Sequence, residues 1–289
     1  MHGIGRRLGR RLGVAVALAG LAVGVLAGCG SANERPNPNP TPVPGATPGG
    51  KLTIGISFDQ PGIGLKNGDT ITGFDADTAT YIAKALGVPP ENITWKEAKG
   101  DERQRLLTSG EADMIVSTFT ITEERKQQVD FAGPYFVAHQ DLLVRRNEEE
   151  ITGPESLTGK TLCSVPGTTS TDTIQTRYGN TVTLKELPRY SDCVTALANG
   201  DVDAVTTDDV ILAGYAAEPQ YQGKLKVVGK GFSDERYGVG IRKGDTAMVQ
   251  KVDAALQQYV ADGSWKKSLD STVRPSGYSI PSPPVVGSP

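Results

Sequence analysis

Residues Met114–Tyr135 read MIVSTFTITEERKQQVDFAGPY, and this stretch decides the fold that we expect for the chain. Met114–Val116 is an apolar run of the length of a short buried strand. Thr122 stands where a helix N-cap belongs, and Glu123 follows in the first turn, where a carboxylate suits the helix dipole. With Arg125 close behind, hydroxyls, free backbone N–H groups and a guanidinium meet at one strand-to-helix junction. Such a junction can hold a carboxylate; a plain strand–turn–helix with a surface Arg–Glu pair is the alternative.

The same stretch resembles the signature of the family 3 extracellular solute-binding proteins, the amino-acid receptors of ABC importers. The matching residues are Thr120-Ile121-Thr122-Glu123-Glu124-Arg125, Val129-Asp130-Phe131 and Pro134-Tyr135. The resemblance implies that Arg125 holds the α-carboxylate of an amino-acid ligand and that Thr120 donates a further hydrogen bond. Thr118, in the same hydroxyl-rich turn, and Gln60, in the similar segment Phe58–Gly62, are further candidates for ligand binding.

Residues 1–28 are expected to be a lipoprotein signal peptide. A basic segment precedes the apolar run Val14–Ala27, which is too short to span a bilayer comfortably. The run ends in Leu26-Ala27-Gly28-Cys29, which resembles a bacterial lipobox. Cleavage before Cys29 would leave its sulfur to carry a diacylglycerol and would anchor the protein at the extracytoplasmic face of the cell membrane. An ordinary secretory signal with an incidental cysteine is the alternative.

Both ends of the mature chain are expected to lack a packed core. Residues 29–50 include six prolines and almost no bulky apolar side chain, which predicts an extended tether or a disordered spacer. Residues 275–289 are also rich in proline and are expected to form a disordered tail. Removal of the leader's four arginines leaves 26 basic and 33 acidic residues, a net charge of −7, which disfavours nucleic acid as a partner.

Residues 51–274 alternate apolar runs with helical patterns, which predicts an α/β fold with parallel strands and helices on both faces. Strands are expected at residues 51–57, 93–95, 114–116, 142–144, 160–165, 183–187, 203–207, 225–228 and 237–241. Helices are expected at 73–86, 101–109, 170–178, 191–198, 209–217, 246–260 and 264–269. The chain would build lobe 1 from 51–143 plus 238–274 and lobe 2 from 144–237. Two crossing strands would then form a hinge beside a ligand cleft, the two-lobed, type II periplasmic-binding-protein-like fold that the resemblance also implies.

Two cysteines remain in the predicted second lobe, Cys163 in a strand and Cys193 near the start of a helix. Outside the cytoplasmic membrane such a pair is expected to be oxidised, and two buried free thiols are the alternative. Similar glutamate-binding lipoproteins of Gram-positive, actinobacterial type carry cysteines at both places.

The resemblance assigns the ligand's α-ammonium to Asp208, across the cleft from Arg125. Without it, both Asp208 and Asp209 would be interpreted as helix-capping residues. Gly167 and Thr168 match the family's loop that supplies further hydrogen bonds to the α-carboxylate.

The wider resemblance is to the glutamate-binding branch and covers nearly all of residues 51–274. It implies that Arg103 reaches a carboxylate on the ligand's side chain, whereas a helix-face arginine is the alternative. The chain departs from that branch at Ser57, where a lysine is usual, and at Glu102–Arg105, where Asn-Arg-Ile-Pro is usual. The loss of one cation would allow glutamine to compete better with glutamate.

We therefore expect a monomeric, lipid-anchored receptor that binds glutamate and delivers it to an ABC permease. The alternatives are a receptor for glutamine, aspartate or asparagine, or a sensor subunit that signals amino-acid availability. An enzyme is not expected, although a few relatives of this fold are dehydratases. The chain has only two histidines, His2 and His139, and no motif for a catalytic triad, a cofactor or a metal.

Overall fold

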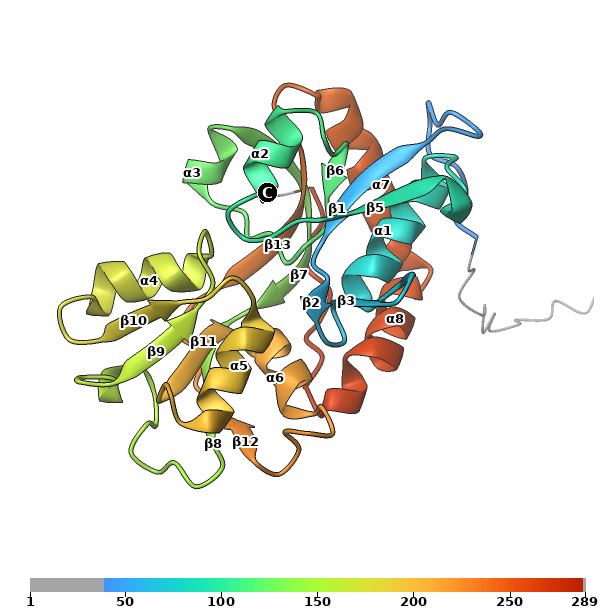
Figure 1. Ribbon diagram of the computed structural model, residues 1–289. Helices are drawn as coiled ribbons and strands as arrows, with labels where there is room; N and C mark the ends of the chain where they lie inside the picture. Colours follow the sequence, from blue (N-terminus) through green and yellow to red (C-terminus); the bar gives the residue numbers. More distant parts are fainter. Residues whose placement is uncertain (1–38, 288–289) are drawn as a thin grey trace, which may run out of the picture. The chain divides into compact units, whose positions relative to one another are not determined.

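The computed structural model of the protein describes residues 39–287 (Figure 1). The predicted signal peptide, Cys29 and the first part of the predicted tether lie outside the described residues. Within residues 39–287 the strands form two five-stranded sheets and one small three-stranded sheet.

The first sheet has the strand order β5-β1-β6-β13-β7. Its strands are β5 (Ile93–Glu97), β1 (Leu52–Ile56), β6 (Met114–Ile115), β13 (Glu235–Arg242) and β7 (Val129–Ala138). Strand β1 is parallel to β5 and β6, whereas β13 is antiparallel to β6 and β7. The expectation of parallel strands therefore holds for three strands, and the sheet as a whole is mixed.

Helices cover both faces of the first sheet. Because successive strand residues point to opposite sides, neighbouring residues of one strand pack against different helices. Met114 packs in a buried cluster with residues of α1 (Phe74–Ala85), α7 (Thr246–Ala261) and α8 (Ser264–Thr272). Its neighbour Ile115 packs in a second cluster, with α2 (Arg103–Thr108). The short helices η1 (Pro90–Asn92), α3 (Glu123–Lys126) and η3 (Arg274–Ser276) complete this part, which we call lobe 1.

The second sheet has the order β10-β9-β11-β8-β12 and follows the same plan. Its strands are β10 (Thr183–Glu186), β9 (Thr161–Ser164), β11 (Ala204–Asp208), β8 (Gln140–Arg145) and β12 (Leu225–Val227). Leu142 and Val144 pack on the face covered by α4 (Thr169–Tyr178), and Leu143 packs on the face covered by α5 (Tyr190–Asn199) and α6 (Asp209–Ala216). With η2 (Pro154–Ser156), these elements form lobe 2.

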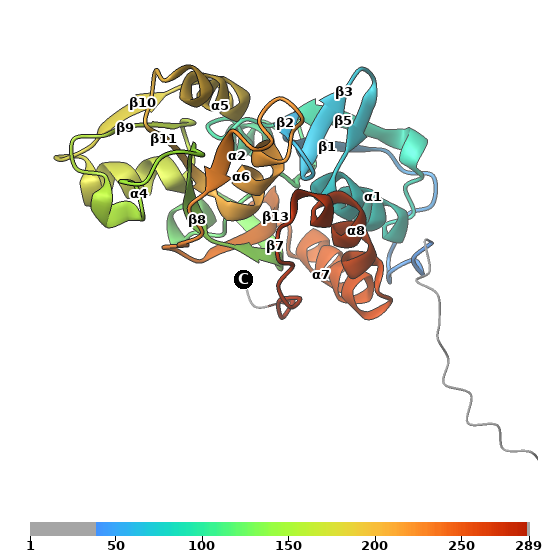
Figure 2. The same cartoon turned by 90° about the horizontal axis from the view of Figure 1, so that it is seen from below.

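The long strands β7 and β13 connect the two lobes and run side by side between them (Figure 2). Their pairing continues as far as Ala138 opposite Glu235, and β8 of the second sheet begins at Gln140. The chain thus changes lobe at His139, not at residue 143, where the sequence analysis placed the boundary. The boundary was misplaced because β7 is a long strand that continues to Ala138. Gly133 and Pro134 interrupt its apolar pattern, so the sequence does not show its length.

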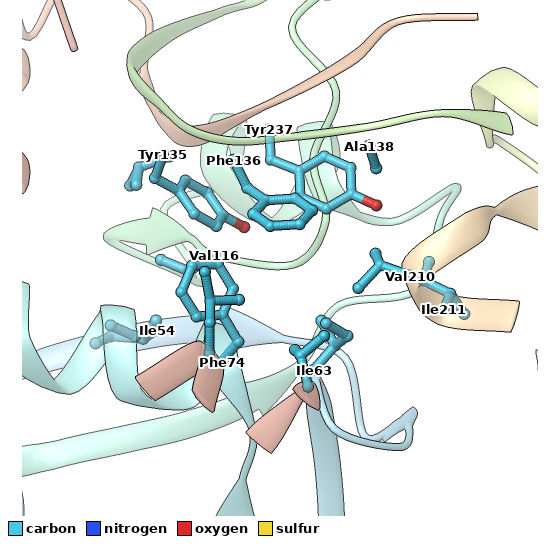
Figure 3. Packing of buried hydrophobic residues seen from close by; sticks show 14 of the residues in the cluster. Ile54, Ile63, Phe74, Val116, Tyr135, Phe136, Ala138, Val210, Ile211 and Tyr237 are labelled. Carbon is cyan, nitrogen blue, oxygen red and sulfur yellow. The ribbon is translucent and has the colours of Figure 1, made fainter. Parts of the chain in front are cut away.

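Aromatic side chains of β7 and β13 form the core beneath this crossing. Phe136 lies between Tyr135 and Tyr237 above the ring of Phe74 (Figure 3). The ring centroids of Phe136 and Tyr237 are 5.7 Å apart, and those of Phe136 and Phe74 are 5.5 Å apart. Ile211 of α6 belongs to the same buried cluster, so apolar packing continues from one lobe into the other.

A small antiparallel sheet, which the sequence analysis did not predict, precedes α1. Its strands are β2 (Asp59–Gln60), β3 (Gly64–Asn67) and β4 (Thr70–Thr72). Asp59 contacts lobe 2, because its carboxylate accepts a hydrogen bond from the backbone N–H of Ser191 at 3.0 Å.

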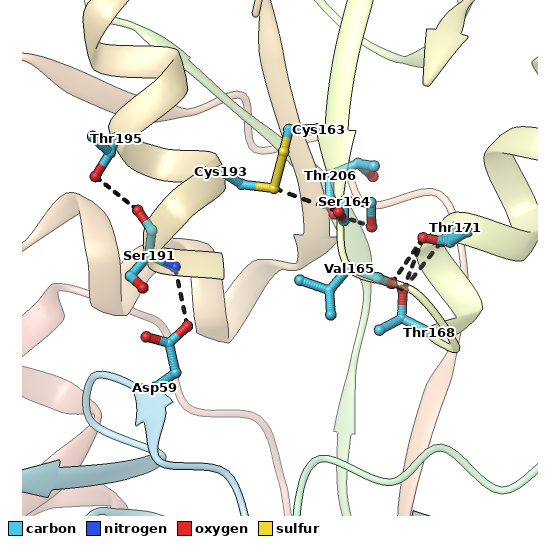
Figure 4. Close-up of a disulfide and its surroundings, with 10 residues drawn as sticks. All are labelled: Asp59, Cys163, Ser164, Val165, Thr168, Thr171, Ser191, Cys193, Thr195 and Thr206. Carbon is cyan, nitrogen blue, oxygen red and sulfur yellow. Dashed lines mark hydrogen bonds between the residues drawn. A yellow bond between two sulfur atoms is a disulfide. The ribbon is translucent and has the colours of Figure 1, made fainter. Parts of the chain in front are cut away.

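The predicted disulfide is present and joins β9 to α5 through Cys163 and Cys193, whose Cα atoms are 5.4 Å apart (Figure 4). Both cysteines are buried, which confirms the oxidised pair over two free thiols. The bond fixes α5 to the sheet close to the helix's first residues.

The described parts of the predicted tether and tail pack on the fold instead of extending away from it. The backbone N–H of Val43, whose side chain is buried, donates to the carbonyl of Ala85 at 2.9 Å. In the tail, Ile280 and Val286 pack against the core, and the Tyr278 hydroxyl donates to the Asp209 carboxylate at 3.1 Å. The expectation of disorder rested on composition, which does not register the tertiary partners that these few apolar and aromatic side chains find.

We predict that Tyr278→Phe lowers the free energy of unfolding by about 1–2 kcal/mol, because a partly buried hydrogen bond to a carboxylate is lost. Urea unfolding measures the change. Tyr221→Phe, which removes an exposed hydroxyl beside Thr195, is the matched control and should change stability by less than about 0.5 kcal/mol. Equal effects of the two substitutions would mean that the tail adds no stability through Tyr278.

Candidate functional site

A cavity lies between the two lobes and is lined by polar residues from both. Lobe 1 contributes Thr118, Thr120, Arg103 and Arg125, which follow or flank strand β6. Lobe 2 contributes the start of α4, the first residue of α5 and the end of β11. The carboxyl ends of β6 and β11 thus meet at one place, as expected for ligand sites of open α/β sheets.

Arg125 is buried, and its guanidinium joins the two lobes. Its Nη1 donates to the carbonyl of Thr120 at 2.8 Å, and its Nη2 donates to the carbonyl of Gly167, in lobe 2, at 3.1 Å. Thr122 is the N-cap of α3, and its hydroxyl accepts from the Arg125 backbone N–H at 3.1 Å. The nearby surface ion pair is Lys126–Glu123, so the surface Arg–Glu pair considered for Arg125 is not formed.

Burial and, to a smaller extent, the positive charge of Arg103 lower the pKa of Arg125 to about 10. At neutral pH the group stays protonated, so its charge is held in a poorly solvated place. An anion that enters the cavity replaces part of the solvation that burial removed.

Thr118 adopts a φ of 41°, in the left-handed region that non-glycine residues seldom occupy. Asp75 holds this conformation, because its carboxylate accepts from the Thr118 backbone N–H and from the Tyr135 hydroxyl, both at 2.8 Å. The predicted site residue Gln60 is also buried and donates to the Thr118 hydroxyl at 3.2 Å. Gln60 and Asp75 therefore position Thr118.

Arg103, at the start of α2, is 5% exposed, so its guanidinium is held inside the protein and not in solvent. Its Nη1 donates to the carbonyl of Thr118 at 3.2 Å, and its Nε has no hydrogen-bond partner. The ring of Phe119 lies 5.2 Å from the Arg103 guanidinium and 5.0 Å from that of Arg125. One aromatic side chain therefore contacts both guanidinium groups, a feature that the sequence motif did not indicate.

Asp208 and Asp209 have separate roles at the end of β11. The side chain of Asp208 makes no capping bond, although it occupies the N-cap position of α6. It accepts from the Tyr237 hydroxyl at 2.5 Å, and burial together with the negative charge of Glu235 raises its pKa well above the usual range. Asp209 instead accepts from the backbone N–H of Val210 at 2.8 Å. The Asp208 carboxylate is therefore not used to cap the helix, and Tyr237 is a site residue that sequence reasoning missed.

Gly167 and Thr168 lie in a loop of lobe 2 that contacts lobe 1. Gly167 has a φ of +72°, and a Cβ added there would lie 2.6 Å from the backbone of Asp101, so only glycine fits. The hydroxyl of Thr168 donates to the carbonyl of Val165 at 2.8 Å and accepts from the backbone of Thr171 (Figure 4). The single hydroxyl proton of Thr168 is thus already engaged within lobe 2.

A second cavity adjoins the first, and both are lined by Arg103, Thr168 and Tyr190. The second also contains Gln60 and Ser57 in its wall. The Ser57 hydroxyl accepts from the backbone N–H of Asp59 at 3.2 Å. Ser57 therefore adds no charge to this part of the cleft.

No group of His, Cys, Asp and Glu side chains in residues 39–287 is arranged to hold a metal ion. Across the same range, no helix combines the length and apolar character needed to cross a membrane.

The sequence profile of the bacterial extracellular solute-binding proteins, family 3, matches residues 52–272. The chain belongs to this family. The glutamate-binding protein GluB of Corynebacterium efficiens is 41% identical to it over 231 residues, which are 76% of this chain and 78% of that protein. The ABC transporter glutamine-binding protein GlnH of Bacillus subtilis is 38% identical over 218 residues, 74% of this chain and 78% of that protein.

The solved structure of an ancestral arginine-binding protein bound to arginine superposes with a TM-score of 0.72. It is 34% identical, and the match covers 77% of this chain and 98% of that one. The predicted family and the predicted type II binding-protein fold are thus confirmed. Of the predicted site residues, six line the first cavity together: Arg103, Thr118, Thr120, Arg125, Thr168 and Asp208. Their contacts with a ligand stay predictions.

We predict that Asp75 makes the stability of the protein fall as the pH rises from about 4 to about 7. Burial raises the Asp75 pKa from 3.8 to about 7, so between these values the folded chain keeps a proton that the unfolded chain loses. The contribution decreases by up to about 1.4 kcal/mol per pH unit. Urea unfolding of the unmodified protein and of Asp75→Asn, from pH 4.5 to 7.5, isolates the contribution of Asp75 to the free energy of unfolding.

The stability of the unmodified protein relative to Asp75→Asn should decrease with pH across this window. A difference that is constant with pH would show that Asp75 has an ordinary pKa in the folded protein.

Proposed function

We propose that this protein is a receptor that binds glutamate between its lobes. The observation that supports this proposal best is the charge of the first cavity. Among the described residues, its charged lining consists of two buried guanidinium groups, Arg103 and Arg125, and one carboxylate, Asp208. Glutamate carries two carboxylates and one ammonium, so it matches each of these three groups with an opposite charge.

The invariant part of an amino acid fits the Arg125 end of the cavity. Arg125 has five N–H donors, of which two bonds to carbonyls occupy only part, and donors remain for an α-carboxylate. The N-terminus of α4 lines the same cavity and favours an anion there. Asp208, free of a capping bond, suits the α-ammonium, whose charge would also offset the cost of ionising this buried carboxyl.

The side chain of the ligand would then extend toward Arg103. The unpartnered Arg103 Nε and the adjoining cavity provide a cation and space for a second carboxylate. The similarity to one protein named as glutamate-binding and another named as glutamine-binding supports a ligand of this length. Glutamine is the second candidate, because neutral Ser57 lines the side-chain cavity. Aspartate and asparagine are further candidate ligands. A sensing role would use the same cavity.

We further propose that the receptor is anchored by a lipid on Cys29 at the extracytoplasmic face of the membrane and delivers its ligand to an ABC permease. The sequence of the leader and the family of the chain support this. In this role the ligand is released unchanged, so prolonged incubation with glutamate should yield no product.

We predict that Arg125→Met and Asp208→Asn weaken all α-amino acid ligands alike, because every such ligand presents the same carboxylate and ammonium. Loss of one partner of a desolvated charge pair costs about 2–5 kcal/mol, or about 30- to 4,000-fold in affinity. Arg103→Met should weaken glutamate by a comparable factor and glutamine much less. Calorimetric titration of each variant with both ligands gives these ratios.

Arg105→Met is the matched control, since Arg105 lies on the same helix but is exposed and pairs with Glu111. It should leave both affinities within about threefold of the unmodified protein. Tight glutamate binding by Arg125→Met would remove the basis of the proposal. Equal losses of glutamate and glutamine in Arg103→Met would make Arg103 a structural residue.

We predict that Cys29→Ala releases the protein from the membrane fraction, because the thiol that would carry the lipid is absent. Fractionation of cells, with metabolic labelling by a fatty acid, detects this change. Cys163→Ala, which leaves the lipobox intact, is the control and should remain labelled. A labelled, membrane-bound Cys29→Ala protein would contradict lipid attachment at this residue.

A further inference from the structure

Charged residues other than Arg103 also line the second cavity. Lobe 1 places Glu97 and Lys99 in its wall, and lobe 2 places Arg189 there. Glu97 is the last residue of β5, and a short loop leads from it to α2, which carries Arg103. The Ser117 hydroxyl donates to the Ala98 carbonyl at 3.2 Å and holds that loop against the strand-to-helix junction.

Arg189 and Glu97 form an ion pair across the cleft. The Arg189 Nη2 lies 2.6 Å from the Glu97 Oε1, and the two side chains are 36% and 27% exposed. Arg189 occupies the N-cap position of α5 with an extended backbone, and its side chain makes no capping bond. Its side chain is therefore used for the contact with lobe 1 and not for the helix.

Asp59 also lines the second cavity, and its carboxylate accepts hydrogen bonds from the Ser191 N–H and the Tyr215 hydroxyl, so the pair decides whether Glu97 adds a further negative charge. An unpaired Glu97 would repel a carboxylate on the ligand's side chain and would compete for the Arg103 guanidinium, which lines the same cavity. Arg189 neutralises Glu97 and leaves Arg103 to the ligand. A neutral side chain such as an amide would be affected far less by the same change.

The position of Arg189 depends on lobe closure and on the fixed start of α5. The next residue, Tyr190, lines both cavities, and the Ser191 N–H donates to Asp59 of lobe 1. The disulfide at Cys193 secures the helix to β9. Arg189 therefore meets Glu97 in the same arrangement of the lobes in which Tyr190 lines both cavities and Ser191 contacts Asp59.

We propose that the Arg189–Glu97 pair is a specificity determinant, which selects an acidic over a neutral ligand side chain by neutralising Glu97 when the lobes close. This inference rests on the proposed binding of glutamate.

Calorimetric titration of the full-length chain with glutamate and with glutamine tests the proposal through the ratio of the two affinities. Arg189→Met should reduce the preference for glutamate at least about tenfold. The double variant Glu97→Gln/Arg189→Met should restore the ratio to within about threefold of the unmodified protein, since the carboxylate that Arg189 neutralises is then also absent. Arg177→Met, at an exposed arginine of lobe 2, is the control and should not change the ratio.

Equal losses for both ligands in Arg189→Met would make the pair a closure contact without a role in selectivity and would overturn the proposal. A double variant that keeps the reduced preference would also overturn it, because Arg189 would then act on the ligand directly. Failure of the proposed function is visible separately, in the unmodified protein. If that protein binds neither ligand, the function proposed above is wrong and this inference is wrong with it.

Discussion

The site depends on one buried guanidinium, that of Arg125. Burial of a charge costs free energy unless donors and partners are matched, and here carbonyls from both lobes and the ring of Phe119 supply only part of the match. Neighbouring features of the fold serve this group. Thr122 caps the helix that carries it, and Gly167 lets the lobe 2 backbone come close enough to accept from it. In the proposed function an anionic ligand would complete the set of partners, so that binding and closure would stabilise the same charge.

On the lobe 2 side of the cavity, two adjacent aspartates, Asp208 and Asp209, have different partners. Asp209 accepts from the backbone N–H groups of His139 and Val210 and from the Tyr278 hydroxyl. The Asp208 carboxylate instead lines the cavity, with the Tyr237 hydroxyl as its partner. Tyr237 belongs to β13 of lobe 1, whereas Asp208 ends β11 of lobe 2. The bond between them therefore crosses the hinge. Burial and Glu235 together oppose ionisation of Asp208, and a cation bound beside it would favour ionisation.

The sequence predicts those parts of the molecule that local patterns specify. Caps and apolar periods located helices such as α6, and the motif around Thr122 located Arg125. The hairpin strands β2 to β4 were missed because they are short and carry no long apolar alternation. Tyr237 could not be found as a site residue, because its contact with Asp208 arises only when β13 pairs with β6 and β7 and brings distant segments together. Phe119 was missed because the motif does not show that both guanidinium groups fold back onto its ring. Composition likewise failed for Val43 and Tyr278, whose partners lie far away in the sequence.

The contacts that we propose for closure and for selectivity share one structural element, the start of α5. Its Ser191 N–H binds Asp59, its first residue Tyr190 lines both cavities, and the preceding Arg189 pairs with Glu97. Because the disulfide fixes this turn to β9, the three contacts move as one body with lobe 2. If the proposed pair selects the ligand, a side chain that is repelled by Glu97 would also oppose the approach of Ser191 to Asp59. Discrimination between side chains would then act on the closing equilibrium itself, since a ligand shifts such an equilibrium only by its difference in affinity for the open and closed states.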